Sequence, residues 1–507
     1  MNISHTLPSR WLQLAIAFSL AASLTACGGG GGGGESSSVD SGTPGSTTTP
    51  GTTPAPGTAG LQDATLVSRQ GEGGNSASLV AIDAAGNSIA VWIKDEGSSF
   101  PEKKELLARR YVVGVGWQAV EILASDATVV DFESPAITID QATGKAVVGW
   151  VSSSRSVGGR NSAVVARAYD PASGWAAPAI VKQFTPNYSV VQPVLSTDAN
   201  GNVIAVWSAI EILGSNLYAN RYTPAGGWGT ATLLTPENGV TGQSGGAGNP
   251  VLAFTVNGNG LVLFNRSVSN RSTIWGIQYT VGSGWGTSAV VVDLERGQEP
   301  FRLIDTPRIA SDANGNAVAV WSQQTLPPGT GSYELGVWAK RYTGGAWSAN
   351  STLITPPVLC TNCPSNRDLI VKMNAQGLAA ATWWAAGSSA VQMSRLRTDG
   401  TWEALVANAG QSNGFLDYTS TPDIGIDAQG NIRSVWVFNS PGDSSVYTNQ
   451  YVAGTGLGAA QLLESHPSTT GFPRIAVNAR GNAMTVWQQF DDQLGTVVAG
   501  RYYNSGR

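Results

Sequence analysis

Few side chains in this chain of 507 residues are candidates for catalytic chemistry. There are two histidines, His5 and His466, so a Ser-His-Asp triad would have little choice of base. His466 stands in Glu464-Ser-His-Pro, no partner for it is identifiable, and a solvated loop histidine is the favoured interpretation. The sequence contains no His-Glu-x-x-His motif, phosphate-binding loop or dinucleotide fingerprint. We therefore predict no cofactor and favour a protein that is not an enzyme.

Two neighbouring cysteines, Cys360 and Cys363, have the Cys-x-x-Cys spacing of redox and metal sites. A thioredoxin-like site needs a strand-to-helix context that this segment lacks, and a structural zinc site needs more than one pair of ligands. We therefore predict a disulfide between Cys360 and Cys363 that pins a surface loop, and no metal at this position.

Single carboxylates recur along the chain next to a repeated glycine. The glycine occurs eight times at intervals of 51 to 62 residues, usually with Asp or Asn three positions before it. Calcium loops need alternating acidic ligands, whereas each copy offers one carboxylate, so a turn closed by the Asp or Asn side chain is favoured. The glycines are Gly86, Gly144, Gly201, Gly258, Gly315, Gly377, Gly430 and Gly481.

Apolar residues alternate on both sides of each turn, as in Arg308-Ile-Ala-Ser and Ala317-Val-Ala-Val-Trp, which predicts two strands. A third strand ends in motifs such as Ala339-Lys-Arg-Tyr, echoed by Ala499-Gly-Arg-Tyr502, and a fourth begins at pairs such as Gly227-Trp228. Four strands in about 50 to 57 residues are the unit of a β-propeller blade. We predict an all-β fold of eight four-stranded blades.

A large aromatic residue stands six positions after each repeated glycine. Seventeen tryptophans are present, and most fall at this position or at the Gly-Trp pairs. Packing between blades is the favoured role, in preference to stacking on carbohydrate. The eight aromatic residues are Trp92, Trp150, Trp207, Phe264, Trp321, Trp383, Trp436 and Trp487.

The N-terminal segment has the features of a cleaved leader. Arg10 precedes an apolar stretch, residues 11–24, that is too short to span a membrane and runs into Leu24-Thr-Ala-Cys27. This order resembles a bacterial lipoprotein signal with its lipobox. The resemblance implies removal of residues 1–26 and lipidation of Cys27, whose several acyl chains would anchor the protein stably in a membrane. No Asp follows Cys27, so the resemblance implies the outer membrane of the cell envelope.

Residues 27–59 comprise the cysteine and a tether of seven glycines followed by a Ser/Thr/Pro/Gly tract. Polyglycine after the cysteine also resembles some surface-exposed lipoproteins, so the periplasmic and exposed faces of the outer membrane both stay open. The formal net charge is −5 and no basic run occurs, which argues against nucleic acid as a partner.

The two ends of residues 60–507 complement each other. Gly60-Leu-Gln-Asp-Ala-Thr-Leu matches the fourth strand at Gly456-Leu-Gly-Ala-Ala-Gln-Leu, whereas the eighth repeat stops after its third strand. We predict that the N-terminal strand completes the last blade and closes the ring, which leaves no exposed edge. The chain resembles bacterial β-propeller repeat proteins broadly, while the sialidase Asp-box spacing, Ser-x-Asp-x-Gly-x-x-Trp, is not met.

Proline opens the first strand of six copies, which suits a strand that lines the central channel. The short turns should lie on one rim and long variable loops on the other, and binding residues gather on such loops. We predict contact through six residues there: Asp95, Arg155, Glu295, Arg296, Arg367 and Asp491.

These observations indicate a membrane-anchored envelope protein whose propeller binds or scaffolds a protein or polysaccharide. The alternative is a lectin or a carbohydrate-active enzyme with its site at the channel mouth. Two carboxylates about 5 to 10 Å apart there would favour a glycosidase. Exposed tryptophans in repeated pockets between blades would favour a lectin.

Overall fold

The computed structural model describes residues 59–69, 74–95, 104–125, 129–156, 159–184, 188–211, 214–236, 247–255, 257–268, 271–292, 304–325, 332–355, 358–360, 367–385, 390–407, 418–440, 443–464, 469–493 and 495–507. They belong to one unit, residues 51–507. These residues form strands and turns, and none of them forms a helix long and apolar enough to cross a membrane.

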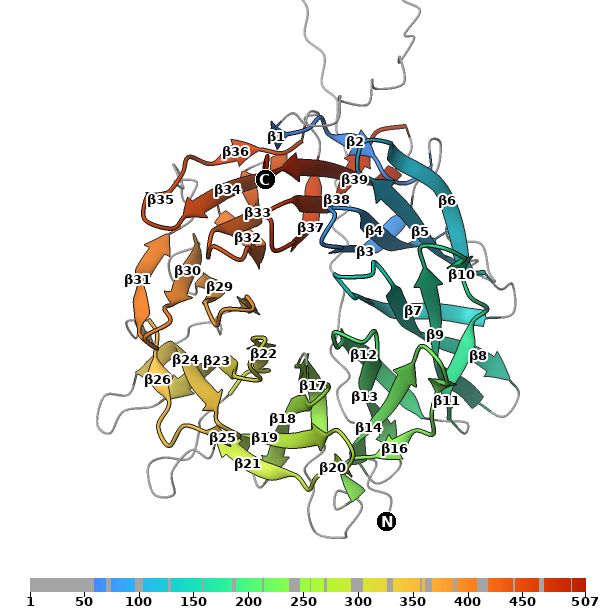
Figure 1. Ribbon diagram of the computed structural model, residues 1–507, viewed down its shortest axis with the longest axis vertical. Helices are drawn as coiled ribbons and strands as arrows, with labels where there is room; N and C mark the ends of the chain where they lie inside the picture. The colour runs from blue at the N-terminus through green and yellow to red at the C-terminus, as the bar shows by residue number, and fades with distance from the viewer. Residues whose placement is uncertain are drawn as a thin grey trace, which may run out of the picture. The chain divides into compact units, whose positions relative to one another are not determined.

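The strands form eight antiparallel sheets, which are the predicted blades (Figure 1). Blade one holds β3 (Asn75–Ile82), β4 (Ser88–Asp95), β5 (Lys104–Val112) and β6 (Gly116–Ser125). Blade two holds β7 (Val129–Ile139), β8 (Ala146–Ser156), β9 (Gly159–Asp170), β10 (Gly174–Trp175) and β11 (Ala179–Gln183). Blade three holds β12 (Ser189–Thr197), β13 (Val203–Glu211), β14 (Gly214–Thr223), β15 (Gly227–Trp228) and β16 (Thr232–Leu233). Blade four holds β17 (Ala247–Phe254), β18 (Gly260–Val268), β19 (Arg271–Thr280), β20 (Gly284–Trp285) and β21 (Ala289–Val292).

Blade five holds β22 (Arg308–Ser311), β23 (Ala317–Thr325), β24 (Tyr333–Thr343), β25 (Ala346–Trp347), β26 (Thr352–Leu353) and β27 (Val358–Cys360). Blade six holds β28 (Arg367–Met373), β29 (Ala379–Ala385), β30 (Ala390–Leu396) and β31 (Trp402–Ala407). Blade seven holds β32 (Tyr418–Ile426), β33 (Ile432–Ser440), β34 (Asp443–Val452), β35 (Gly456–Leu457) and β36 (Gln461–Leu462). Blade eight holds β37 (Thr470–Val477), β38 (Ala483–Asp491) and β39 (Gly495–Asn504), together with β1 (Gly60–Leu61) and β2 (Thr65–Leu66).

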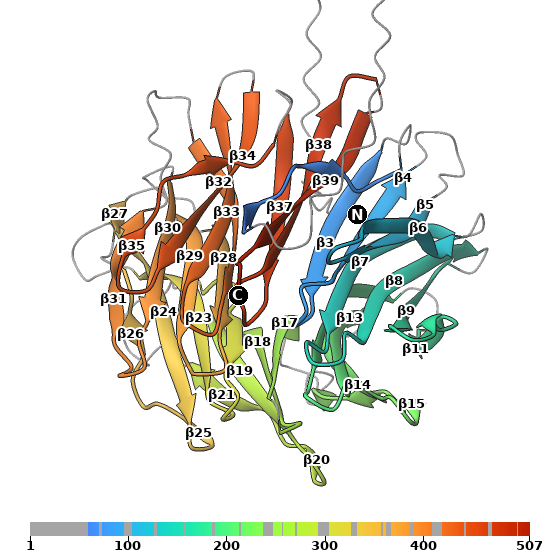
Figure 2. The ribbon, with the colours of Figure 1, turned by 45° about the horizontal axis from the view of Figure 1, so that its top comes forward.

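The first strands of the blades surround the central channel. Each contacts the first strand of the blades on either side, so the series β3, β7, β12, β17, β22, β28, β32 and β37 returns to β3. Figure 2 shows β3 and β7 side by side. Five of these strands, β3, β7, β28, β32 and β37, line a channel cavity of about 400 Å³. The predicted eight-bladed β-propeller is confirmed.

The N-terminal strand closes the ring in the predicted manner. Gly60 pairs with Asn504 and Leu61 with Tyr503, while Thr65 pairs with Gly500. The Val67 amide donates to the Val498 carbonyl at 2.8 Å, and the Val67 side chain is fully buried between blades eight and one. Blade eight therefore reaches four strands only with residues from both ends of the repeat region.

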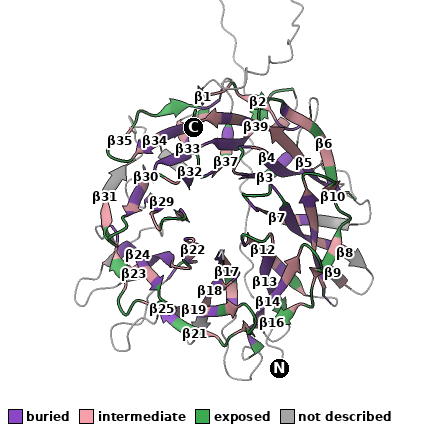
Figure 3. Cartoon of the chain, viewed as in Figure 1, coloured by how far each residue is buried: buried purple, intermediate pink, exposed green. Residues whose placement is uncertain are grey.

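The core lies between the blades. All eight repeated aromatic residues are at most 2% exposed, which confirms their predicted packing role. The second strands are the most buried, and exposed residues appear mainly on the outermost strands (Figure 3). The Gly-Trp tryptophans are half-buried because they pack against the tyrosine of the third strand, with ring centroids 5.1 to 5.5 Å apart in five blades.

The repeated Asp side chain closes its own turn. Asp198 Oδ1 accepts the Asn202 amide at 2.9 Å and Asp198 Oδ2 accepts the Asn202 side-chain amide at 2.7 Å. Asp83, Asp312 and Asp427 make the same pair of hydrogen bonds, so both oxygens of these carboxylates are used. The interpretation as turns is confirmed. Among the described residues no group of acidic, histidine or cysteine side chains could hold a metal ion.

These turns also join neighbouring blades. A Cβ built on Gly258 would lie 3.2 Å from Asp198 Oδ2 of the preceding blade, and one on Gly481 would lie 3.0 Å from Asp427 Oδ2. Both glycines have positive φ, so the repeated glycine serves the turn and leaves room for the adjacent blade.

One predicted alignment is wrong by one residue. Ala483 pairs with Tyr503, as Ser88 pairs with Tyr111 in blade one, so Tyr503 takes the repeated tyrosine position instead of Tyr502. Two adjacent tyrosines made the registers indistinguishable in the sequence. Tyr502 turns to the opposite face, where it stacks on Tyr111 at 4.8 Å and helps to join blades eight and one.

Candidate functional site

Two rims can now be defined. The turn rim carries the Asp-x-x-Gly turns, such as residues 83–87, and the loop rim is the opposite end, where the second strands finish. Asp95 ends β4, Asp491 ends β38 and Arg367 begins β28, so these three predicted contact residues stand at the loop-rim ends of their strands. Arg155 lies next to the loop-rim end of β8. The side chains of Arg155 and Arg367 are outside the described part of the structure, so contact by these residues remains a prediction.

The remaining predicted positions lie outside the described residues. They are Cys27, Glu295, Arg296 and Cys363. Cys360 ends β27, where it pairs with Tyr333, and nothing is described of its side chain. The lipidation, the disulfide and the contacts of Glu295 and Arg296 therefore stay predictions.

The mouth of the channel on the loop rim carries a repeated backbone irregularity. In seven of the first strands the pairing register shifts near the loop-rim end, as between Gly471 and Arg474 of β37. Such a shift is a β-bulge, which bends a strand and redirects its side chains. Six residues at these bulges have positive φ, and we call them the bulge ring: Ala77, Ser134, Asn249, Asp368, Thr421 and Phe472.

The bulges explain the repeated proline. Pro473 follows Phe472 inside the bulge, and the ladder skips both residues. Because Pro473 has no amide hydrogen, it fits a position without a ladder partner. The predicted placement of the proline-bearing strands along the channel is confirmed, and the reason now includes the bulge as well as the free strand edge.

The bulge ring keeps its backbone while its side chains differ. A residue other than glycine in this conformation costs on the order of 1 to 3 kcal/mol, and the cost is greatest for bulky side chains. Phe472 nevertheless has φ of 51° and is 56% exposed, while Asp368, Asn249 and Ala77 are also exposed. Aromatic, acidic and amide side chains of the bulge ring are thus exposed at the loop-rim end of the channel.

Two arginines occupy one repeat position just inside this mouth. Arg308 and Arg474 each directly follow the proline at the loop-rim end of the first strand, and each Nη1 donates to that proline's carbonyl, at 3.2 and 3.1 Å. Both side chains are half-buried. Burial is the main cause that lowers the pKa of Arg308; the charge of Arg474 lowers it further, whereas Asp305 and Asp368 raise it. None of the described residues forms an ion pair with either arginine.

Sequence reasoning did not single out these arginines. The available signal was the residue after each bulge proline, which is Ala136, Val194 or Val251 in three other blades. In blade seven this position holds Asp423, whose oxygens accept the amides of Ile424 and Ile475 at 2.9 and 3.1 Å. Asp423 therefore serves the junction of blades seven and eight, and the arginines depart from an otherwise structural position.

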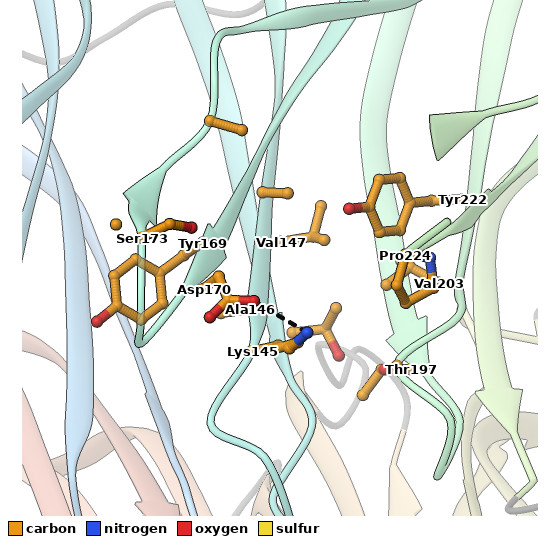
Figure 4. A pocket seen from close by; sticks show the side chains of 15 residues that line it. Lys145, Ala146, Val147, Tyr169, Asp170, Ser173, Thr197, Val203, Tyr222 and Pro224 are labelled. Atoms are coloured by element: carbon orange, nitrogen blue, oxygen red, sulfur yellow. Dashed lines mark ion pairs between the residues drawn. The ribbon is translucent and has the colours of Figure 1, made fainter. Parts of the chain in front are cut away.

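A second kind of cavity lies between blades at the turn rim. A cavity of about 220 Å³ separates blades two and three, and Figure 4 shows Lys145 beside Asp170, with Tyr169 and Tyr222 on opposite sides. Lys145 Nζ lies 2.9 Å from Asp170 Oδ2, and this hydrogen bond lowers the pKa of Asp170 and raises that of Lys145. Because Lys145 and Asp170 neutralise each other, the cavity offers a ligand mainly hydroxyl groups and the edges of tyrosine rings.

A related cavity of about 380 Å³ lies between blades one and two, lined by Tyr111, Tyr169 and Pro171. The tyrosine and proline positions are those of Tyr169, Tyr222 and Pro224 in the first cavity. Neither cavity is lined by tryptophan, so neither shows the exposed tryptophans expected of a lectin. Blade packing accounts for both.

Comparison with known proteins gives likeness to solved propellers at low identity. No protein-family model matches the chain, and no curated protein matches it. The polysaccharide lyase Uly1 is 9% identical with a TM-score of 0.46, covering 74% of this chain and 90% of the lyase. An ulvan lyase of polysaccharide lyase family PL25 is 12% identical with a TM-score of 0.43, covering 70% and 89%. The α-L-arabinofuranosidase Arb93A from Fusarium graminearum is 10% identical with a TM-score of 0.38, covering 89% and 98%.

Proposed function

We propose that this protein is a lipid-anchored envelope protein whose propeller binds one ligand over the channel mouth on the loop rim. The observation that carries the proposal is the bulge ring, in which six blades share a costly backbone conformation and present different side chains. Strain of this kind collects at sites where it serves a task.

The contrast with the turn rim supports this assignment. There the same Asp and Asn side chains make the same hydrogen bonds in four blades, so repetition of sequence follows repetition of structure. At the bulge ring the backbone repeats and the side chains do not. A ring of varied groups around one opening suits a single composite site.

Between the two ligand classes left open by the sequence, one observation favours a saccharide. The ring of Phe472 is more than half exposed at the channel mouth. An exposed aromatic face attracts the weakly positive C–H groups of a sugar ring, and binding sites combine such a surface with a few polar groups. Asp368 and Asn249 of the bulge ring are polar groups of this kind.

The test compares the two rims with substitutions that spare the fold. Asparagine tolerates positive φ, so Phe472→Asn and Ala77→Asn should keep the melting temperature at or above that of the parent. Both should weaken binding of the full-length protein to whichever members of an array of immobilised polysaccharides and envelope proteins the parent binds. Asn200→Lys, at an exposed turn-rim position, is the control. Binding lost in Asn200→Lys and kept in both mouth variants would contradict the proposal.

The anchor is a separate part of the proposal and has its own test. Cys27→Ser removes the sulfur that the lipobox resemblance assigns to the lipid, so the protein should move from the membrane to the soluble envelope fraction. Immunoblots of the membrane and soluble envelope fractions report where the protein partitions. Metabolic labelling of the same cells with palmitate reports whether it is lipidated. Equal labelling and partition of the parent and Cys27→Ser would refute the anchor.

A further inference from the structure

We infer that the channel mouth binds an acidic saccharide, with Arg308 and Arg474 holding its carboxylate or sulfate groups and Phe472 contacting its ring face. This inference rests on the proposed function, because it names the ligand class of the same site.

The first support is the repeated placement of the two arginines. Both arginines directly follow a proline at the loop-rim end of a first strand, and both are held by a hydrogen bond from Nη1 to the proline carbonyl. A guanidinium has five N–H donors in a planar fork that matches carboxylate and sulfate groups. One donor of each is used among the described residues, so the others are available to a ligand.

The second support is the local charge. Arg308 and Arg474 are half-buried, and they lie near enough for the charge of Arg474 to lower the pKa of Arg308. The whole chain has a formal net charge of −5, so two arginines at one repeat position depart from its general composition. Partly buried guanidinium groups with unused donors are suited to binding a carboxylate or sulfate group.

Two nearby carboxylates, Asp305 and Asp368, raise the pKa of Arg308 without forming an ion pair with it. Asp423 is occupied by two backbone amides. Asp305 accepts the Thr306 amide at 2.7 Å and is exposed, and Asp368 is exposed on the bulge ring. Neither Asp305 nor Asp368 is paired with Arg308 within ion-pair distance. These acids can accept hydroxyl hydrogen bonds from a sugar while the arginines hold its charge.

Phe472 decides between an acidic saccharide and an acidic peptide. Its side chain comes from the residue two before Arg474, and it is exposed in spite of the positive φ that burdens a bulky residue. A sugar with an acidic substituent presents an anion and a C–H face on one ring, which fits an arginine and an aromatic residue two positions apart on one strand. A polyglutamate chain offers the anion without that face.

The experiment measures binding of three probes to the full-length protein by calorimetry: oligogalacturonate, a neutral maltooligosaccharide of equal length and a polyglutamate peptide. We expect oligogalacturonate to bind, and salt to weaken its binding. Arg308→Gln and Arg474→Gln should each weaken it about ten- to a hundred-fold, as expected for a charged hydrogen bond. Arg308→Lys, which keeps the charge and loses the fork, should have an intermediate effect.

Matched variants separate this effect from folding. Arg480→Gln removes an exposed arginine on the turn rim and should leave binding unchanged. Phe472→Asn should weaken oligogalacturonate binding, and Phe472→Tyr should restore it. Arg308→Gln removes one of two like charges, so its melting temperature should not fall below that of the parent. An unchanged melting temperature would show that the loss of binding is not caused by unfolding.

The other outcomes overturn the inference. Polyglutamate bound as tightly as oligogalacturonate, with Phe472→Asn inert, would replace the saccharide with an acidic peptide. Equal binding of the neutral oligosaccharide, unchanged in Arg308→Gln and Arg474→Gln, would remove the role of charge. In that case a loss in Phe472→Asn would leave the proposed function standing. No binding of oligogalacturonate would also overturn the inference.

Discussion

Single residues at equivalent positions of the repeat show which chemistry is structural. The amide at the third-strand position is accepted by Ser68 Oγ at 3.2 Å in blade eight, and by Thr235 Oγ1 at 2.9 Å and Thr355 Oγ1 at 3.2 Å in two other blades. In blade seven the acceptor is Glu464 Oε2, 2.9 Å from the Val446 amide. Glu464 is 5% exposed, so an ionisable group has replaced a neutral hydroxyl inside the protein.

This replacement predicts a pH-dependent stability. Burial is the main cause that raises the pKa of Glu464; hydrogen bonds from Ser445, the Val446 amide and Thr470 lower it by less, and the charge of Asp443 adds a small rise. Because the folded state favours the protonated carboxyl, the contribution of Glu464 is fully present below its unfolded pKa of about 4.3 and is lost as pH rises through the folded pKa. Glu464→Gln keeps an acceptor oxygen and cannot ionise. Its unfolding free energy minus that of the parent should therefore increase from pH 4 upward and then level off.

The measurement is urea unfolding of both proteins at a series of pH values. Other carboxylates titrate in both proteins, so their contributions cancel in the difference, and only the Glu464 term remains. Asp399→Asn provides a comparison at an exposed turn. There the carboxylate is not buried, and hydrogen bonds from Thr401 lower its pKa. A difference between Glu464→Gln and the parent that is constant with pH would show that burial does not control this carboxyl.

At the level of strands and turns, the sequence predicts the features that recur from one repeat to the next. The turn, the buried aromatic and the Gly-Trp pair were found because each recurs at nearly fixed spacing, and the structure places each where packing requires it. The bulge could be read only partly, because Pro473 signals an unpaired position but says nothing about the φ of Phe472. The two arginines were not predicted. They stand on the first strands of different blades, far apart in the sequence, and in blade seven the same repeat position holds an aspartate that only stabilises the fold.

The fourth strands show a further limit of the repeat pattern. A continuous strand was expected after each Gly-Trp pair, and β6 is one, but in six blades the strand is broken, as between β15 and β16. At the break between β15 and β16, a side chain of the third strand donates two hydrogen bonds: Asn220 Nδ2 donates to the Gly229 carbonyl at 2.9 Å and to the Val181 carbonyl of the preceding blade at 3.1 Å. Arg109 and Arg501 bridge neighbouring blades in the same way.

At the scale of the whole molecule, closure is the property that a repeat array needs most, because an open ring would expose two blade surfaces. Residues 60–68 provide the closing strand. Val67 is fully buried, Leu61 and Ala64 pack partly buried against the interface of blades seven and eight, and Thr65 Oγ1 accepts the Trp117 indole N–H at 2.9 Å. The short segment therefore contacts three blades.

Deleting residues 60–68 should consequently destabilise the entire propeller. Each buried aliphatic side chain contributes roughly 1.5 to 3 kcal/mol, so the loss amounts to several kcal/mol before the exposed edge of β39 is counted. A fall in melting temperature on the order of 10 °C is expected, together with concentration-dependent aggregation through the unpaired edge. The matched control removes nine tether residues, 50–58, and should melt like the parent. If the deletion of 60–68 also melts like the parent and stays monomeric in light scattering, the N-terminal strand does not hold the ring closed.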